Sequence, residues 1–355
     1  MEIINPPKEV LSAFNELDVV TNIIPFGGGH INSTYKVSTP KTSFIVQKIN
    51  IHVFNRPKEV MSNISKAAEF LKTKNYSYKI LEPLLAKNKS FYTIYGGEYW
   101  RMFPFIEGTI TVEKADDEHQ AYEAAYAFGH FTDSLKGLDC NSLYFTIYDF
   151  HNFEKRLVDF KNSIAKGNPL RLKESRNVID QLLEDSAIIN EITSLTKNIP
   201  LRPIHSDSKI SNILMDEKTN KAVCVIDLDT IMPGHVFYDY GDMVRSFANT
   251  TVEDDPNVPA IDLDWKIFEA LTRGFTEAIG KSLSAEEWKT LLPGAIAVIY
   301  VQALRFLADY LVEDVYYKTD YEKHNLDRAI NQTAYYRTVM QNSEKITKLL
   351  EDLKG

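Results

Sequence analysis

The stretch PIHSDSKISNILMD, residues 203–216, places His205, Asp207 and Asn212 in one loop that leads directly into alternating apolar and polar residues. Such alternation predicts a half-buried strand, which would fix the far end of the loop. A surface turn, in which an Asp or Asn side chain binds its own backbone, would account for either residue alone. Whether the two side chains act together depends on the rest of the chain.

A second strand candidate follows and ends in carboxylates. The segment AVCVIDLDT, residues 222–230, is joined to the first run by a short polar turn and contains Asp227 and Asp229. In the protein-kinase loop HRDxxxxN the aspartate accepts the proton of the attacking hydroxyl and the asparagine binds Mg²⁺, and a later aspartate also binds the metal. Asp207, Asn212 and Asp227 have this order and spacing, which favours phosphoryl transfer.

A glycine cluster indicates another part of the site. The segment GGGHIN, residues 27–32, lies between two strand candidates, and glycines let a backbone approach a ligand closely because they lack Cβ. It matches neither a Rossmann loop, which opens a helix, nor the GxxxxGK[ST] loop. An ordinary hairpin turn and a glycine-rich flap over ATP phosphates both fit. His30 and Asn32 favour the flap, since a turn needs neither an imidazole nor a second amide.

The strand SFIVQKI, residues 43–49, resembles the kinase strand that carries the phosphate-binding lysine. Strict alternation places Gln47 where that lysine would stand and turns Lys48 to the opposite face. Either an amide replaces the lysine or a one-residue shift presents Lys48, and the pattern leaves both possibilities open.

The composition is that of an ordinary soluble protein. The 355 residues are 44% hydrophobic and 25% charged, and the formal net charge of −9, with both signs interspersed, argues against a nucleic-acid or anionic-membrane surface. Cys140 and Cys224 form no CxxC pair, which fits a reducing compartment. There is no signal-peptide pattern, and the longest apolar run, residues 291–301, has 11 residues. We expect a cytoplasmic protein without nucleic-acid or membrane partners, of unspecified oligomeric state.

The first part of the chain reads mostly as strands. One amphipathic helix is predicted over residues 59–74, and a hairpin is predicted to turn at Gly96 and Gly97. We expect this strand-rich, nucleotide-binding lobe to comprise residues 1–104.

The remainder reads mostly as helices. Apolar residues recur at helical spacing over residues 118–136, 300–311 and 339–353, and the last of these predicts a C-terminal helix. Together the two parts predict an α+β fold with two lobes, like that of protein kinases. Its small N-lobe would hold an antiparallel sheet, and its large, mainly helical C-lobe, residues 105–355, would carry the catalytic loop and one hairpin.

Seven segments resemble the aminoglycoside phosphotransferase and choline kinase superfamily, which has a protein-kinase-like fold. They are GHINSTY, FIVQKIN, YWRMFPFIEGT, HSDSKISNILMD, VIDLDTIMPG, DYGDMVR and RFLADYLVEDVYY, and they span most of the chain. The resemblance is closest to N-acetylhexosamine 1-kinases, to which RFLADYL and the glutamine of IVQKIN point. It implies an enzyme that uses ATP and Mg²⁺ to phosphorylate the anomeric hydroxyl of GlcNAc or GalNAc, with ATP and the sugar as partners.

The resemblance also implies roles for individual residues. Asp207 would be the catalytic base, and Asn212 and Asp227 would bind Mg²⁺. The nucleotide-binding residues would be Gly27, Gly28, Gly29, Gln47, Lys48, Met102, Phe103 and Phe105. The sugar-binding residues would be His30, Asn32, Asp229, Arg305 and Tyr316.

Plainer roles are open for several residues. Arg305 could pair with Asp309, four residues further along a helix, and Tyr316 could pack in the core. Asp239 and Asp242, in YDYGDMVR, could brace the catalytic loop, cap a helix or pair with a nearby arginine.

Two other functions stay open. A kinase of the same fold could act on choline, homoserine or an aminoglycoside, although a cationic acceptor favours a pocket of acids or aromatic rings. A non-catalytic pseudokinase could sense nucleotide or sugar, but the intact Asp207, Asn212 and Asp227 argue against it. The sequence specifies neither the preferred hexosamine nor whether its N-acetyl group is required.

Overall fold

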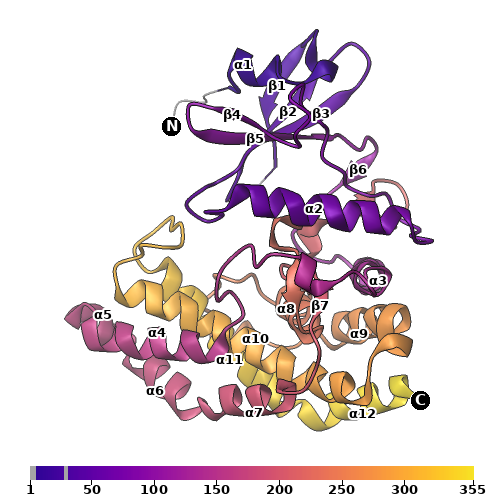
Figure 1. Cartoon of the computed structure of the whole chain (residues 1–355). Helices are drawn as coiled ribbons and strands as arrows, with labels where there is room; N and C mark the ends of the chain where they lie inside the picture. Colours follow the sequence, from indigo (N-terminus) through magenta and orange to yellow (C-terminus); the bar gives the residue numbers. More distant parts are fainter. Residues whose placement is uncertain (1–4, 28–30) are drawn as a thin grey trace.

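The computed structural model describes residues 5–27 and 31–355 and has two lobes (Figure 1). A five-stranded antiparallel sheet forms the body of the N-lobe, and helices dominate the C-lobe. Helix α2 (Pro57–Lys72), drawn in purple, lies across the boundary between the sheet and the helical lobe. The predicted two-lobed α+β fold is confirmed.

The N-lobe sheet has the strand order β1-β2-β3-β5-β4. Gly96 and Gly97 form the predicted turn between β4 and β5, with φ 58° and 84°. Positive φ at both central residues is typical of two-residue hairpins and favours glycine. The strands are β1 (Asn22–Pro25), β2 (Ser33–Ser38), β3 (Ser43–Lys48), β4 (Thr93–Tyr95) and β5 (Glu98–Pro104).

The pleat of this sheet separates an outer from an inner face. Trp100 and Met102 of β5 belong to the outer face, where α1 (Lys8–Leu11) and the turn after it cover them in a small apolar core. Gln47 of β3 and Arg101 of β5 are register partners on the inner face. The inner face, which looks towards the C-lobe, therefore carries polar side chains.

Two short sheets in the C-lobe hold the loop that opened the sequence analysis. β8 (Ile213–Asp216) and β9 (Ala222–Val225) form the predicted hairpin and pair with β6 (Thr109–Ile110). β7 (Arg202–Ile204) pairs with β10 (Met232–Gly234). The loop between β7 and β8 leaves one sheet and enters the other, so both of its ends are fixed.

The C-lobe helices pack around α10 (Ala285–Leu311). Its neighbours are α4 (Phe153–Lys166), α7 (Ala187–Thr196), α8 (Phe237–Phe247) and α11 (His324–Gln341). The other helices are α3 (Glu118–Ser134), which confirms the helix predicted over residues 118–136, α5 (Pro169–Glu174), α6 (Arg176–Glu184), α9 (Trp265–Ile279) and α12 (Ser343–Lys354).

The predicted C-terminal helix is found as α12, except that Val339 belongs to the preceding helix. α11 ends at Gln341, and α12 begins at Ser343. Between them, the side chain of Asn342 donates a hydrogen bond from Nδ2 to the carbonyl of Thr338 at 2.9 Å. Because this side chain satisfies one of the last carbonyls of α11, it competes with continuation of the helix.

By length and composition alone, α10 could cross a membrane. It contains the apolar run 291–301, and 61% of its most apolar window is buried inside the protein. Its place among α4, α7, α8 and α11 accounts for this apolar character as that of a core helix.

Gly294 allows α10 to approach α8 closely. A Cβ at this position would lie 2.4 Å from ring carbons of Phe237, the first residue of α8. We expect Gly294→Ala to lower the free energy of unfolding by at least about 1 kcal/mol, because overpacking outweighs the gain in helix propensity. Urea denaturation measures this. Lys289→Ala, at an exposed position of α10, should stay within about 0.5 kcal/mol of the parent, and equal stability of the two variants would contradict the packing argument.

Candidate active site

The loop between β7 and β8 is held by a carboxylate from α8. Asp239 is buried and accepts hydrogen bonds from the N–H groups of His205, at 3.0 Å, and Ser206, at 2.7 Å. These bonds hold Ser206 at a φ of 69°, in the left-handed region. Asp239 therefore braces the loop, whereas Asp242 pairs with Arg245 at 2.8 Å.

The buried ring of His205 joins this loop to the end of the next hairpin. Its Nδ1 accepts the N–H of Asp207 at 3.3 Å, so Nε2 carries the hydrogen that is donated to the carbonyl of Ile226 at 2.9 Å. Phe128 meets the ring edge-on, with 5.2 Å between ring centroids. His205 thus fixes the backbone of Asp207 relative to that of Asp227.

Asp207 is held through one carboxylate oxygen. Asn212 Nδ2 donates to Asp207 Oδ2 at 2.9 Å and to its carbonyl at 2.8 Å, and Lys209 Nζ lies 3.2 Å from Oδ2. Burial opposes ionisation, but the charge of Lys209 and these hydrogen bonds outweigh it and keep the pKa of Asp207 below its ordinary value. Asp207 is therefore a carboxylate at neutral pH, and Asn212 and Lys209 both contact Oδ2 rather than Oδ1.

Asp227 follows β9 in a left-handed conformation, with φ 57° and ψ 52°. The surrounding protein displaces water, and the carboxylates of Asp229 and Asp207 add like charge, so that the pKa of Asp227 rises to about 6. Lys209 and Arg101 offset part of this effect. A buried carboxylate whose pKa is raised by burial and by neighbouring acids is a favourable place for a divalent cation.

The donor set fits Mg²⁺. Because Asn212 directs Nδ2 at Asp207, its Oδ1 lies on the other side of the amide and is available as a neutral oxygen ligand. Asp227 adds a carboxylate, and Mg²⁺ commonly completes such a shell with water and substrate phosphates. Residues 5–27 and 31–355 contain no group of three or more His, Cys, Asp or Glu able to hold a metal ion.

A buried arginine joins the N-lobe sheet to these acids. Arg101 forms a two-pronged ion pair with Asp229, in which Nη2 donates to Oδ2 at 2.9 Å and Nη1 donates to Oδ1. Each side chain is only 2% exposed. Gln47 orients the guanidinium, because its Oε1 accepts from Arg101 Nε at 3.0 Å while its Nε2 donates to Thr34 Oγ1 at 3.0 Å.

The cation that reaches the acids was missed by the sequence analysis. Lys48 lies on the opposite side of the sheet from Gln47, where its Nζ is 3.7 Å from Glu98. Gln47 has both ends of its amide occupied. One signal could have identified this cation. Arg101 is the one charged residue in the buried run of β5, and it lies opposite Gln47 in register.

Asn32 reaches the same carboxylate from the N-lobe. Its Nδ2 donates to Asp229 Oδ2 at 2.7 Å, and its Oδ1 accepts the N–H of Asn50 at 3.0 Å. Two of the predicted sugar-binding residues therefore lie together at the junction of the lobes. Of the predicted glycine loop, Gly27 has φ 80°, and Gly28, Gly29 and His30 lie outside the described residues.

The other predicted nucleotide-binding residues lie at the end of β5. Met102 faces the outer core and Phe103 the inner one. The ring of Phe105 meets that of Phe26 edge-on, with centroids 5.5 Å apart, and Lys36 Nζ lies 3.5 Å from the Phe105 centroid. Phe105 and Phe26 thus bring the end of β5 next to the start of the glycine loop.

Arg305 and Tyr316 come together at the end of α10. Arg305 Nη1 donates to Gln302 Oε1 at 3.0 Å. The guanidinium lies 5.4, 5.9 and 5.5 Å from the ring centroids of Phe150, Tyr316 and Tyr317. These rings surround the arginine with aromatic faces.

The plainer roles considered for Arg305 and Tyr316 are wrong. Asp309 accepts the backbone N–H groups of Tyr316, at 2.8 Å, and Tyr317, at 2.9 Å, and Arg305 binds Gln302 instead. Tyr316 is 59% exposed, so it is not a core residue.

Two arginines lie near a histidine at this end of the C-lobe. The ring of His151 stacks on Tyr238 at a centroid distance of 3.8 Å, and burial together with the charges of Arg305 and Arg156 lowers the pKa of His151 to about 3. Burial also lowers the pKa of Arg156, whose Nε is buried without a hydrogen-bond partner among the described residues. A neutral histidine and two arginines therefore share this region.

The bracing role of Asp239 gives a direct prediction. Asp239→Ala should lower the free energy of unfolding by roughly 2–4 kcal/mol, because two buried N–H groups lose a charged acceptor. The same change should lower kcat about 100-fold, since it displaces the loop that carries Asp207. Urea denaturation and initial rates measure the two effects. Asp180→Ala, which removes an exposed acid of α6, should alter neither, and an Asp239→Ala variant with normal kcat would contradict the bracing role.

Solved structures share this architecture at low sequence identity. An aminoglycoside phosphotransferase from Alicyclobacillus acidocaldarius aligns with a TM-score of 0.65 and 13% identity, covering 98% of this chain and 96% of its own. A microcompartment-associated aminopropanol kinase aligns with a TM-score of 0.62 and 16% identity, covering 95% and 96%. An ADP-bound aminoglycoside phosphotransferase aligns with a TM-score of 0.55 and 15% identity, covering 94% and 99%. These similarities show the fold.

A family model described as the phosphotransferase enzyme family (APH) matches residues 22–264. The matched span runs from the start of the N-lobe sheet to the end of the loop after α8, and it includes Asp207, Asn212 and Asp227. The chain belongs to the phosphotransferase enzyme family.

Proposed function

We propose that this phosphotransferase uses ATP and Mg²⁺ to phosphorylate the anomeric hydroxyl of an N-acetylhexosamine, GlcNAc or GalNAc, to the sugar 1-phosphate. The observation that carries the proposal is the grouping of Asp207, Asn212 and Asp227, which supplies one ionised carboxylate and two oxygen ligands in a unit fixed by hydrogen bonds. Similarity to an ADP-bound phosphotransferase supports ATP as the donor. The nucleotide would lie between the lobes formed by residues 1–104 and 105–355.

The charge of the C-lobe end supports a neutral acceptor over a cationic one. Aminoglycosides and amino alcohols carry ammonium groups, which aromatic rings bind through their faces. Here Arg305 already lies over Phe150, Tyr316 and Tyr317, and Arg156, which also pairs with Asp159 at 3.7 Å, lies nearby. A sugar with hydroxyl groups and an acetamido carbonyl offers acceptors to these arginines without charge repulsion.

In the proposed reaction the residues of this chain mainly position the acceptor. Asp207 Oδ1 accepts a hydrogen bond from the anomeric hydroxyl and takes its proton as the hydroxyl oxygen bonds to the γ-phosphorus and the bond to the ADP oxygen breaks. Asn212 and Lys209 hold the other carboxylate oxygen and so fix the direction of Oδ1. Mg²⁺, when bound, offsets the negative charge of the phosphates.

An anomeric hydroxyl is more acidic than an ordinary alcohol, so a carboxylate with a lowered pKa, such as Asp207, is a sufficient base. A loose transition state also delays the proton transfer, which makes orientation more important than basicity. The neutral state of His151 keeps the region free of a further titrating cation at neutral pH.

We also propose that the protein acts in the cytoplasm. Cys140 and Cys224 are both free thiols, as expected in a reducing compartment. The net charge of −9 supports a role without nucleic-acid or anionic-membrane partners.

The substrate assignment predicts a definite activity profile. Mg²⁺-dependent release of ADP from ATP should occur with GlcNAc or GalNAc and exceed that with glucose, galactose, choline, homoserine or kanamycin. The product should lose reducing-end reactivity, because the anomeric oxygen carries the phosphate. Turnover of a non-sugar alone, or of a sugar whose reducing end stays free, would refute the substrate assignment. Absence of turnover with every compound would refute the N-acetylhexosamine assignment and leave another acceptor or a pseudokinase.

Asp207→Asn is the matched variant for this assay. It should lower kcat by roughly 10²–10⁴, as expected for loss of a general base, while the affinity for ATP measured by calorimetry stays near that of the parent protein. Asp352→Asn, at an exposed position of α12, serves as the control for removing one negative charge. Near-normal turnover in Asp207→Asn would show that this residue is not the base.

A further inference from the structure

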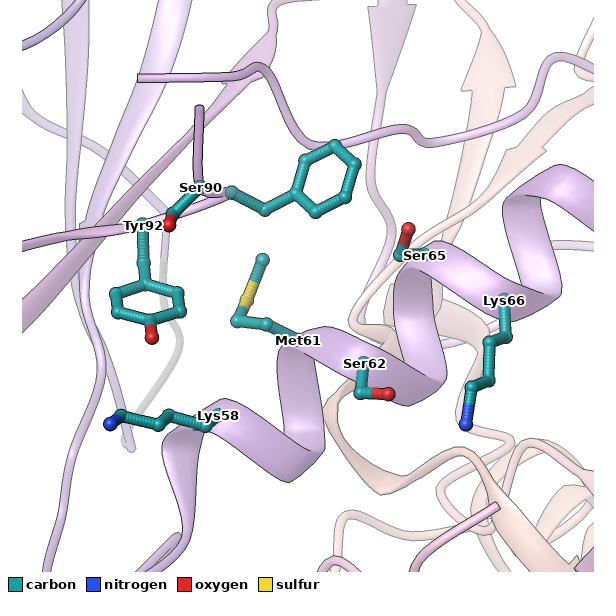
Figure 2. Close-up of a pocket in the computed structure, with 8 residues that line it drawn as sticks. Lys58, Met61, Ser62, Ser65, Lys66, Ser90 and Tyr92 are labelled. Carbon is teal, nitrogen blue, oxygen red and sulfur yellow. The ribbon is translucent and has the colours of Figure 1, made fainter. Parts of the chain in front are cut away.

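A cavity of about 330 Å³ opens on α2, lined by helix residues 58–66 together with residues 90–92 (Figure 2). None of its lining residues belongs to the candidate active site. α2 lies between this cavity and the C-lobe, and Met61 of α2 reaches into the cavity. We propose that the cavity binds a small organic anion with an apolar body, and that its occupancy is coupled to nucleotide binding in the active site.

The charge of the cavity favours an anion. Lys58 lines it and forms no ion pair or hydrogen bond to the described residues, and its ammonium points to the same end as the hydroxyl of Tyr92 (Figure 2). Ser62 and Ser90 add hydroxyl groups, Ser65 donates its own to Glu69 Oε1 at 3.4 Å, and no lining residue is acidic. The Tyr92 hydroxyl at the same end as the Lys58 ammonium would provide a phosphate or carboxylate with both charge and a hydrogen bond (Figure 2).

Two other features narrow the ligand class. Met61 and Phe91 supply apolar surface beside the polar groups, which suits an aryl or alkyl body. The cavity also lies at the first turns of α2, a 16-residue helix whose N-cap, Arg56, makes no side-chain capping bond. An anion near this end is favoured by the helix dipole, although Pro57 has no N–H and Glu59 donates its own to the carbonyl of Arg56.

The coupling runs through residues of α2 that lie within one turn of each other. Met61 lines the cavity, and its Sδ lies 3.7 Å from Nη1 of Arg101. Asn63, buried on the same helix, donates to the carbonyls of Tyr144 at 2.7 Å and Ile231 at 2.9 Å. A ligand that packs against Met61 therefore contacts a side chain that also touches Arg101, and Arg101 in turn binds Asp229 of the candidate active site.

A second lysine of the cavity joins α2 to the C-lobe. Lys66 Nζ donates to the carbonyl of Ser142 at 2.5 Å, while the lysine itself lines the cavity. With Asn63 it fixes α2 to residues 142–144 and to Ile231, which follows the turn after Asp227. Because these hydrogen bonds hold α2 to the C-lobe, occupancy of the cavity changes the contact between Met61 and Arg101 without moving the whole helix.

Calorimetry with phenyl phosphate tests the site. We expect saturable binding to the full-length protein, weaker binding of phenol, and an affinity at least about 10-fold lower in Lys58→Gln, which loses a charge-assisted contact. Lys41→Gln, at an exposed turn, should bind like the parent protein. Asp227→Ala should also retain binding, because the cavity is separate from the candidate metal site. Equal affinity in Lys58→Gln, or loss in Asp227→Ala, would overturn the assignment.

Reciprocal titrations test the coupling. The dissociation constant of phenyl phosphate should change by about 5-fold or more when Mg²⁺ and ADP are saturating, and that of ADP should change by the same factor when phenyl phosphate is saturating. Lys58→Gln should bind ADP normally and lose this dependence. Identical constants in the presence and absence of the other ligand would overturn the coupling, whichever acceptor the enzyme phosphorylates.

Discussion

Arg101 and Asp229 form a two-pronged ion pair between the N-lobe sheet and the acids of the C-lobe, with each side chain 2% exposed. Burial of two charges costs several kcal/mol for each, so such a pair adds little net stability, but removing one partner leaves an uncompensated buried charge. Its main effect here is geometric. Gln47 of β3 binds Arg101 of β5 and Thr34 of β2, and Asn32, just before β2, binds Asp229. These contacts hold the three strands in fixed positions relative to the Asp229 carboxylate, two residues from Asp227.

The charges around this pair explain how the site is prepared for a metal and phosphates. Burial, together with the neighbouring carboxylates of Asp229 and Asp207, raises the pKa of Asp227 to about 6, and Lys209 and Arg101 compensate only part of the negative charge. Backbone N–H groups bound by Asp239 and the ring of His205 hold the loop against this repulsion. The folded protein thus stores electrostatic energy that a bound cation would relieve.

The sequence predicted the parts of this arrangement that depend on local spacing. Asp207, Asn212 and Asp227 could be grouped because a loop of fixed length lies next to a hairpin with alternating residues. No local motif marked Arg101: the signal was one charge within an apolar strand, and its partner is 128 residues away, so only the tertiary fold shows which acid it binds. The break at Asn342 was missed for a different reason: a side-chain hydrogen bond to Thr338 outweighed an apolar period that continued through both helices.

A double-mutant cycle on Arg101 and Asp229, read out as the affinity for Mg²⁺ and ADP, tests the central role of the pair most directly. Arg101→Met and Asp229→Leu should each weaken binding about 10-fold or more, and the double variant should be no weaker than the worse single variant, because the same contact is lost. Lys48→Gln, on the other face of the sheet, should bind normally. Additive losses, or single variants that bind like the parent protein, would contradict the account.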